Sequence, residues 1–155
     1  MSYANGEIYI KNIRSAANTA TYTFSGDENG ETFVPSFTSH GFRYVEITGN
    51  GCELSDISCV TSLEGLVLCN TPDTTGSFEC SDPLVNQLQS NIQWGQRGNS
   101  LLVYTDCPQR NERMGWTGDA QVFAPTAAFH MDVQSFMNKW LLDVRDGQLM
   151  YNRQG

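Results

Sequence analysis

The sequence predicts a mixed α and β fold, with antiparallel strands in its first half and helices in its second. Up to Leu68, short runs rich in β-branched and aromatic residues alternate with turn signals. Beyond Cys80, apolar residues instead repeat at the three- and four-residue spacing of an amphipathic helix. These two periods indicate that the two halves of the chain differ in structure.

Four runs in the first half predict strands, at 7–10, 20–24, 42–47 and 65–68. In the third run the side chains alternate between two faces, as they do in a sheet with one face buried. Glycine-rich segments at 26–30 and 49–51 predict turns between the strands. We therefore expect an antiparallel sheet, or part of one.

The second half begins with a predicted helix that Ser81 or Asp82 can cap and whose first turn carries Pro83. Its apolar residues recur at the spacing i, i+4 and i+8, at Leu84, Leu88 and Ile92. We expect this helix to end near Gly95 or Gly98.

A clearer helix follows Asp132, which can cap it. Its apolar stripe predicts a packing face made of Val133, Phe136, Met137, Trp140, Leu141 and Val144. Between the two helices, residues 120–131 are helix-like, with Pro125 marking either the start of that helix or a kink.

Composition excludes several classes of protein. The 155 residues carry 9 basic and 17 acidic side chains, a formal charge of −8, so a nucleic-acid partner is not expected. No apolar run approaches the roughly 18 residues of a membrane span, so no membrane partner is expected. The first fifteen residues lack the basic start and apolar stretch of a secretory signal, and we assign no compartment.

The 5 cysteines show no C-x-x-C spacing, so we predict neither a metal site nor a redox pair and expect buried or idle thiols. A sheet layer and two or three helices must each cover an apolar face. Neither half has enough partners to complete its own core. We therefore expect the chain to be an excerpt of something larger, whose last helix would expose its apolar stripe.

Segment 105–119 concentrates chemistry, with three carboxylates, two guanidinium groups and an indole. Pro108, Gly115 and Gly118 favour a loop over a helix. Glycosidic cleavage uses such groups: one carboxylic acid protonates the leaving oxygen and a second carboxylate acts from the far face of the ring.

Structural interpretations of the same residues are equally open. Asp106 and Glu112 can pair with two arginines in an ion-pair network. Asp119 can cap the helix that follows it. Trp116 can belong to a core. Spacing alone leaves the function undecided.

Residues 106–121 read D-C-P-Q-R-N-E-R-M-G-W-T-G-D-A-Q. This stretch resembles D-C-P-Q-R-D-E-R-L-G-W-T-G-D-A-Q, the signature of the bacterial-type α-L-rhamnosidases of glycoside hydrolase family 78. Segments 37–46, 75–81 and 91–99 also resemble this family. A similarity of this length is far more specific than a short motif.

The resemblance implies a fold: a partial antiparallel β-sandwich over residues 1–72, followed over residues 73–155 by the first helices of a catalytic α/α toroid. It implies an inverting acid/base hydrolysis that releases terminal L-rhamnose from α-L-rhamnosides, without a cofactor. Rhamnose-containing glycosides or polysaccharides are the implied partners, and a homo-oligomer is left open. The alternative is a non-catalytic sugar-binding or inert fragment.

The resemblance also implies roles for individual residues. Glu112 would be the general acid, and the rhamnose subsite would be lined by Asp106, Arg110, Trp116 and Asp119. The family's base is a glutamate far downstream of Gly155, so we expect these 155 residues alone to be inactive. The chain departs from the signature at Asn111, where the family has Asp, and from the family pattern at Tyr104, where Pro is usual.

Overall fold

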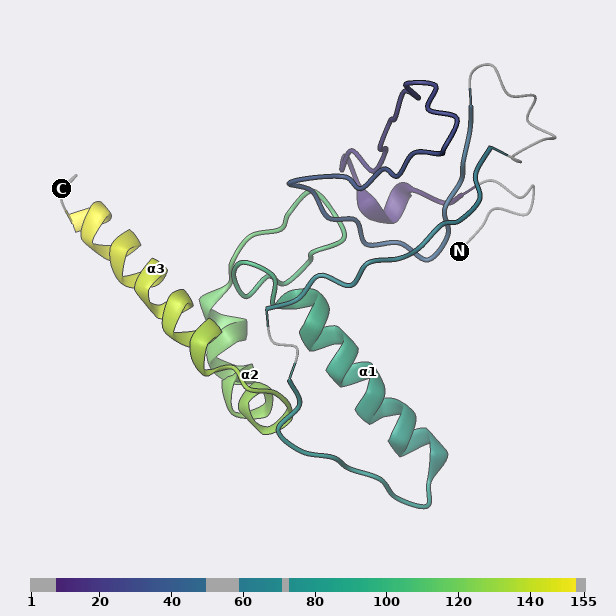
Figure 1. The fold of residues 1–155 in the computed structure, drawn as a ribbon. Coiled ribbons are helices and arrows are strands. Elements are labelled where there is room, and N and C mark those ends of the chain that lie inside the picture. Colours follow the sequence, from purple (N-terminus) through teal and green to yellow (C-terminus); the bar gives the residue numbers. More distant parts are fainter. Residues whose placement is uncertain (1–7, 50–58, 71–72, 153–155) are drawn as a thin grey trace. The chain divides into compact units, whose positions relative to one another are not determined.

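The computed structural model describes residues 8–49, 59–70 and 73–152. The chain divides into two compact units: Met1–Leu66 with Gln109–Asn111, and Val67–Pro108 with Glu112–Gly155. The described elements are a 3₁₀ helix η1 (Lys11–Ile13) and three α-helices, which are α1 (Pro83–Asn99), α2 (Thr117–His130) and α3 (Gln134–Asn152) (Figure 1).

The first unit contains η1 and long stretches without regular structure. Within the described residues, the predicted strands at 20–24, 42–47 and 65–68 form no ladder. The β-sandwich therefore stays a prediction. Part of the predicted turn at 49–51 and the start of the strand at 7–10 lie outside the described residues.

The predicted turn at 26–30 is confirmed. Gly26 and Gly30 have φ of 89° and 93°, a region that glycine adopts without strain. Inside the turn, the carboxylate of Glu31 accepts hydrogen bonds from the backbone N–H groups of Ser25 and Asp27 and from the Tyr22 hydroxyl. These bonds, that of Tyr22 first, lower the pKa of Glu31 to about 2. The ionised carboxylate therefore organises the turn.

The sign of this pKa shift predicts how the turn responds to pH. Because the folded pKa lies below 4.5, the usual pKa of a free glutamate, the stabilisation is complete above that pH. It is lost as the pH falls through about 2. We expect the amide resonances of Ser25 and Asp27 in NMR spectra to follow this titration, and Glu31→Gln to give the low-pH spectrum at neutral pH. Glu28→Gln, an exposed neighbour, is the control and should leave these resonances unchanged.

The second unit begins with α1, whose predicted cap is confirmed. A carboxylate oxygen of Asp82 accepts a hydrogen bond of 2.8 Å from the backbone N–H of Leu84, and Pro83 is the first helical residue. The helix continues past Gly95 and Gly98 and ends at Asn99. The side-chain amide of Asn99 donates to the Gly95 carbonyl at 2.7 Å and satisfies an oxygen of the last turn.

Helix α2 begins three residues before the predicted start at residue 120. Pro125 lies inside the helix, so it does not mark the start of the helix. The cap of α3 is confirmed, because a carboxylate oxygen of Asp132 accepts a 3.1 Å hydrogen bond from the backbone N–H of Gln134.

The core of the second unit lies where α2 meets α3. Two adjoining clusters form it: Tyr104, Ala120 and Phe136 in one, and Ala127, Met131 and Val133 in the other. Met137 packs against both, and Trp140 against the first. The predicted stripe of α3 is thus confirmed as a packing face as far as Trp140.

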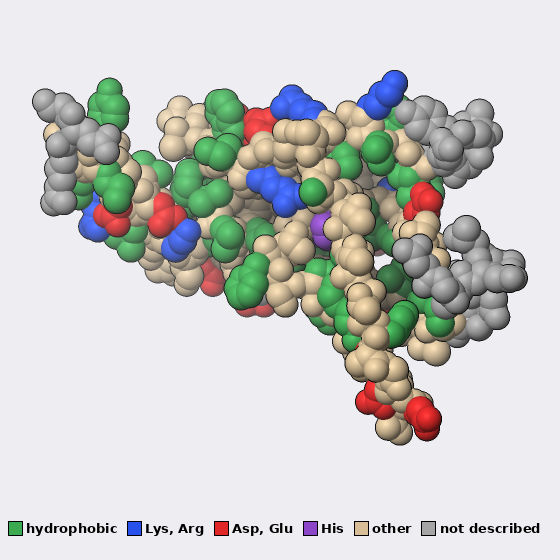
Figure 2. Space-filling model, turned by 90° about the horizontal axis from the view of Figure 1, so that it is seen from above, with side chains coloured by type: hydrophobic (Ala, Val, Ile, Leu, Met, Phe, Trp, Pro, Cys, Tyr) green, Lys and Arg blue, Asp and Glu red, His purple; other side chains and the backbone are tan. Residues whose placement is uncertain are grey.

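Beyond Trp140, the apolar residues of α3 are mostly outside the core. Leu141, which the stripe included, is 59% exposed, and Leu149, Met150 and Tyr151 are also exposed. Apolar side chains are visible along this helix at the left of Figure 2. None of the described helices is long and apolar enough to cross a membrane.

The C-terminal end of α2 is held by residues from other parts of the second unit. The backbone N–H of Thr75 donates to the His130 carbonyl at 3.1 Å, and Thr74 and Met131 form an antiparallel bridge. From α1, Gln96 is 3% exposed and donates to the Ala127 carbonyl at 3.1 Å. The contact from Thr75 satisfies a carbonyl that the end of a helix leaves free, whereas the Ala127 carbonyl also accepts from the Met131 N–H.

Candidate active site

The segment that carries the predicted site is a loop whose two ends are joined by backbone contacts. Thr105 and Gly115 form an antiparallel bridge, and the backbone N–H of Trp116 donates to the Tyr104 carbonyl at 3.0 Å. The segment was predicted as a loop as far as residue 119, but helix α2 already begins at Thr117. The loop therefore spans residues 106–114, which we call the acid loop.

Three side chains of the acid loop converge. A carboxylate oxygen of Asp106, the sulfur of Cys107 and a carboxylate oxygen of Glu112 lie within 4.8 Å of one another. The Cys107 thiol donates to Oδ2 of Asp106 at 3.5 Å, and the side chains of Asp106 and Glu112 form a hydrogen bond. All three side chains are partly buried. The structure thus brings together the predicted acid, Glu112, and one predicted sugar-binding residue.

The surroundings of Asp106 shift its pKa in opposite directions. Burial alone raises the pKa of Asp106, but hydrogen bonds with the Glu112 side chain and with Cys107 outweigh it, so the pKa is lowered. The surroundings of Asp106 therefore favour its ionised form.

The same three side chains have the spacing of a metal site. Acidic groups with this spacing are common in proteins without a bound metal ion. We therefore assign no metal or cofactor to this cluster.

Trp116 and Asp119 lie at the start of α2. Trp116 occupies the N-cap position without a side-chain cap, and its indole is 48% exposed, so the core interpretation is wrong. Asp119 lies in the first turn of α2 and is exposed, so the N-cap interpretation is wrong as well. Its charge is favourable at the positive end of the helix dipole. Both side chains are accessible to a ligand.

Arg110 and Asn111 belong to the segment Gln109–Asn111, which packs with the first unit. Arg110 thus belongs to a different compact unit from Asp106 and Glu112. The side-chain amide of Asn111 donates to the Ser15 hydroxyl oxygen at 2.6 Å. An ionised aspartate, the usual residue of the signature, has no hydrogen to donate, so Asn is suited to this contact. The predicted ion-pair network with the arginines stays a hypothesis.

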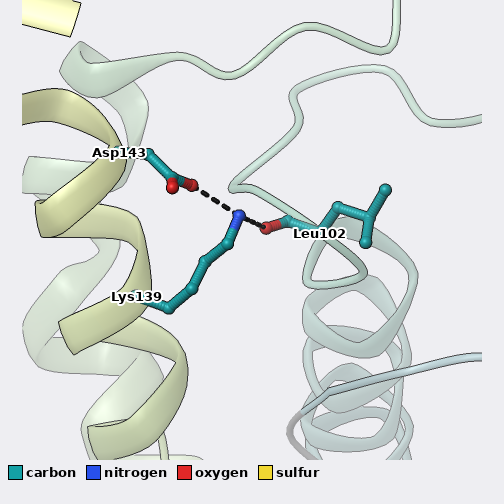
Figure 3. A network of polar contacts seen from close by, with 3 residues as sticks. All are labelled: Leu102, Lys139 and Asp143. Carbon is teal, nitrogen blue, oxygen red and sulfur yellow. Dashed lines mark hydrogen bonds and ion pairs between the residues drawn. The ribbon is translucent and has the colours of Figure 1, made fainter. Parts of the chain in front are cut away.

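The residues that support the acid loop were not predicted as part of the site. Tyr104 is 6% exposed, and its ring packs edge-on against Phe136 with the ring centroids 4.7 Å apart. Lys139 of α3 donates to the Leu102 carbonyl at 2.9 Å and pairs with Asp143 (Figure 3). Only the Lys139–Asp143 pair has a local spacing, i and i+4 on one helix. The contacts of Tyr104 with Phe136 and of Lys139 with Leu102 join residues far apart in the sequence, so no local pattern indicates them.

An apolar pocket of about 170 Å³ lies elsewhere in the second unit. It is lined by Phe78, Val85, Leu88, Gln89, Ile92 and Phe129. The lining contains no carboxylate, so acid/base chemistry points to the acid loop instead.

Family models match both halves of the chain. Residues 2–68 match the bacterial alpha-L-rhamnosidase concanavalin-like domain. Residues 73–153 match the bacterial alpha-L-rhamnosidase 6 hairpin glycosidase domain. The second match covers more than half of the chain.

Curated relatives agree with these matches. An alpha-L-rhamnosidase of Streptomyces avermitilis is 53% identical over 144 residues, which is 93% of this chain. An alpha-L-rhamnosidase of Formosa agariphila is 46% identical over 144 residues, which is also 93% of this chain. The chain spans 14% and 15% of the length of these two relatives.

A solved structure is also similar, the crystal structure of Streptomyces avermitilis alpha-L-rhamnosidase complexed with L-rhamnose. It has a TM-score of 0.80 and 52% identity, and the match covers 94% of this chain and 14% of that one. Family models, curated relatives and a solved structure thus agree. The chain belongs to the bacterial α-L-rhamnosidase family.

Proposed function

We propose that this chain carries the acid half of a glycosidase active site, which releases terminal L-rhamnose from α-L-rhamnosides with inversion. The observation that supports this most directly is the hydrogen-bonded carboxyl pair of Asp106 and Glu112. A general acid must hold a proton at the working pH and stand in a site where that proton can be given up. In this proposal Glu112 provides that proton.

The two carboxyl groups take different roles in this proposal. The pKa of Asp106 is lowered, so Asp106 is the ionised member of the pair. Glu112 is assigned the transfer of a proton to the glycosidic oxygen as the bond breaks. Neighbouring carboxyl groups that divide their roles in this way are a recurring arrangement in acid/base enzymes.

The remaining residues supply sugar binding. The exposed indole of Trp116 can stack on the apolar face of a sugar ring, and the Asp119 carboxylate can accept hydrogen bonds from ring hydroxyls. A guanidinium such as that of Arg110 can donate hydrogen bonds to sugar hydroxyls, and the family resemblance supports its inclusion. We assign these three side chains and Asp106 to the rhamnose subsite.

We place the catalytic base outside these 155 residues. In an inverting glycosidase the two carboxyl groups stand roughly 6.5–9.5 Å apart, because a water molecule must fit beside the sugar. Carboxylate oxygens of Asp106 and Glu112 lie within 4.8 Å of each other, which is too close for that arrangement. Asp106 is therefore not the base that an inverting mechanism requires.

The test uses a protein of the relatives' length that contains this segment, incubated with an aryl α-L-rhamnoside. Proton NMR of the first-formed product should show β-L-rhamnose, the inverted anomer. The 155-residue chain alone is the control and should release none. Release of the α-anomer first would contradict inversion. Rhamnose binding without any release of sugar would instead favour a sugar-binding module.

A further inference from the structure

We propose that Trp140 of α3 is a positioning residue for the Asp106–Glu112 pair. This inference rests on the proposed function of that pair as the acid of a glycosidase. Trp140 itself is 26 or more residues away in sequence from the acid loop and takes no part in the chemistry. Its role would be to fix the end of the loop from which Glu112 projects.

The first observation is a close approach between the Trp140 ring and Gly115. A Cβ atom added to Gly115 would lie 2.5 Å from Cη2 of Trp140 and 3.0 Å from its Cζ3. Such distances are shorter than van der Waals contact, so only a residue without a side chain fits here. The indole thus lies directly against the backbone that ends the acid loop.

The second observation concerns the other end of the loop. The ring of Tyr104 packs edge-on against Trp140, with centroids 6.5 Å apart and an interplanar angle of 79°. Because Thr105 and Gly115 form a bridge, the residues before and after the loop are held together. One indole therefore contacts both ends of the loop.

The third observation is the short distance along the chain from these ends to the carboxyl groups. Asp106 directly follows Thr105, and Glu112 stands three residues before Gly115. Within the loop, the backbone N–H of Arg113 donates to the Cys107 carbonyl at 3.4 Å. A shift of the loop's ends therefore moves the two carboxyl groups. The hydrogen bond between these groups depends on the distance between their oxygen atoms.

The experiment compares variants in a protein of the relatives' length that contains this segment. Trp140→Leu keeps an apolar residue in the core but removes the ring. We expect it to lower kcat on a natural rhamnoside by about 10²-fold, because small misplacements of catalytic groups have effects of this size. The KM should change little, since Trp140 is not in the rhamnose subsite. The kcat on an activated aryl rhamnoside, whose leaving group needs less proton donation, should fall less.

Three further variants separate positioning from stability. Trp140→Phe keeps an aromatic ring and should restore most of the rate. Gly115→Ala adds a methyl group that pushes the loop and the ring apart. It should change the ratio of rates on the two substrates and the pH–rate profile in the same way as Trp140→Leu. Asn138→Ala, which changes an exposed polar residue of the same helix, is the matched control and should be normal.

The alkaline limb of the pH–rate profile, where the acid loses its proton, provides a readout that a merely structural role would not move. We expect this limb to shift in Trp140→Leu and Gly115→Ala. The proposal is overturned if both variants keep the normal limb and the normal ratio of rates on the two substrates, even with lowered thermal stability. Normal turnover of Glu112→Gln would instead overturn the proposed function.

Discussion

Glu112→Gln, in a protein of the relatives' length, is expected to lose nearly all cleavage of natural rhamnosides while still binding rhamnose. Proton transfer by a positioned group contributes about 10²–10⁴-fold to a rate, and a side-chain amide cannot make that transfer. An aryl rhamnoside with a good leaving group needs less protonation, so it should lose much less. Steady-state rates on both substrates and rhamnose binding by calorimetry test these expectations.

The matched control is Glu79→Gln, which removes an exposed carboxylate from the same unit and should leave both rates unchanged. Equal losses on the two substrates would indicate that Glu112 does not donate the proton. Unchanged turnover on a natural rhamnoside would contradict the assignment altogether.

Phe136→Ala is expected to have the largest effect on stability. Phe136 is 5% exposed and packs against Tyr104 and Ala120 in the core between α2 and α3. Truncation of a buried Phe to Ala typically lowers the free energy of unfolding by about 3–5 kcal/mol, because it leaves a cavity. That is a large share of the roughly 5–15 kcal/mol that stabilises a whole domain.

Urea denaturation of the same protein, followed by circular dichroism, measures this loss. Gln148→Ala, which changes an exposed polar residue further along α3, is the control and should change the free energy of unfolding far less. Equal losses for the two variants would show that the core does not lie where the structure places it.

The helices could be predicted from the sequence because the signals that define them are local. The caps of α1 and α3 depend on Asp82 and Asp132, each within two residues of its hydrogen-bond donor. The start of α2 was missed because its N-cap residue, Trp116, makes no side-chain cap and so gives no signal. Strand pairing, in contrast, depends on partners that local patterns do not identify.

The residues of the candidate site stay a prediction from the signature resemblance, which proposes Glu112 and Asp106. Their positions along the chain do not predict the hydrogen bond between their side chains. The contacts that hold the acid loop were missed for a similar reason. Trp140 reads as one more residue of an amphipathic stripe, and its approach to Gly115 is a long-range contact.

The assignment of Gln109–Asn111 to the first unit has a consequence for how these proteins evolve. The signature is continuous in sequence, but its middle packs with Gly41 and Ser15 while the residues on either side belong to the helical unit. Recombination that joins the helical half of one protein to the first half of another would change the residues against which Gln109–Asn111 pack. We therefore expect the two halves to be inherited together, and the helical half to exchange poorly as an independent module.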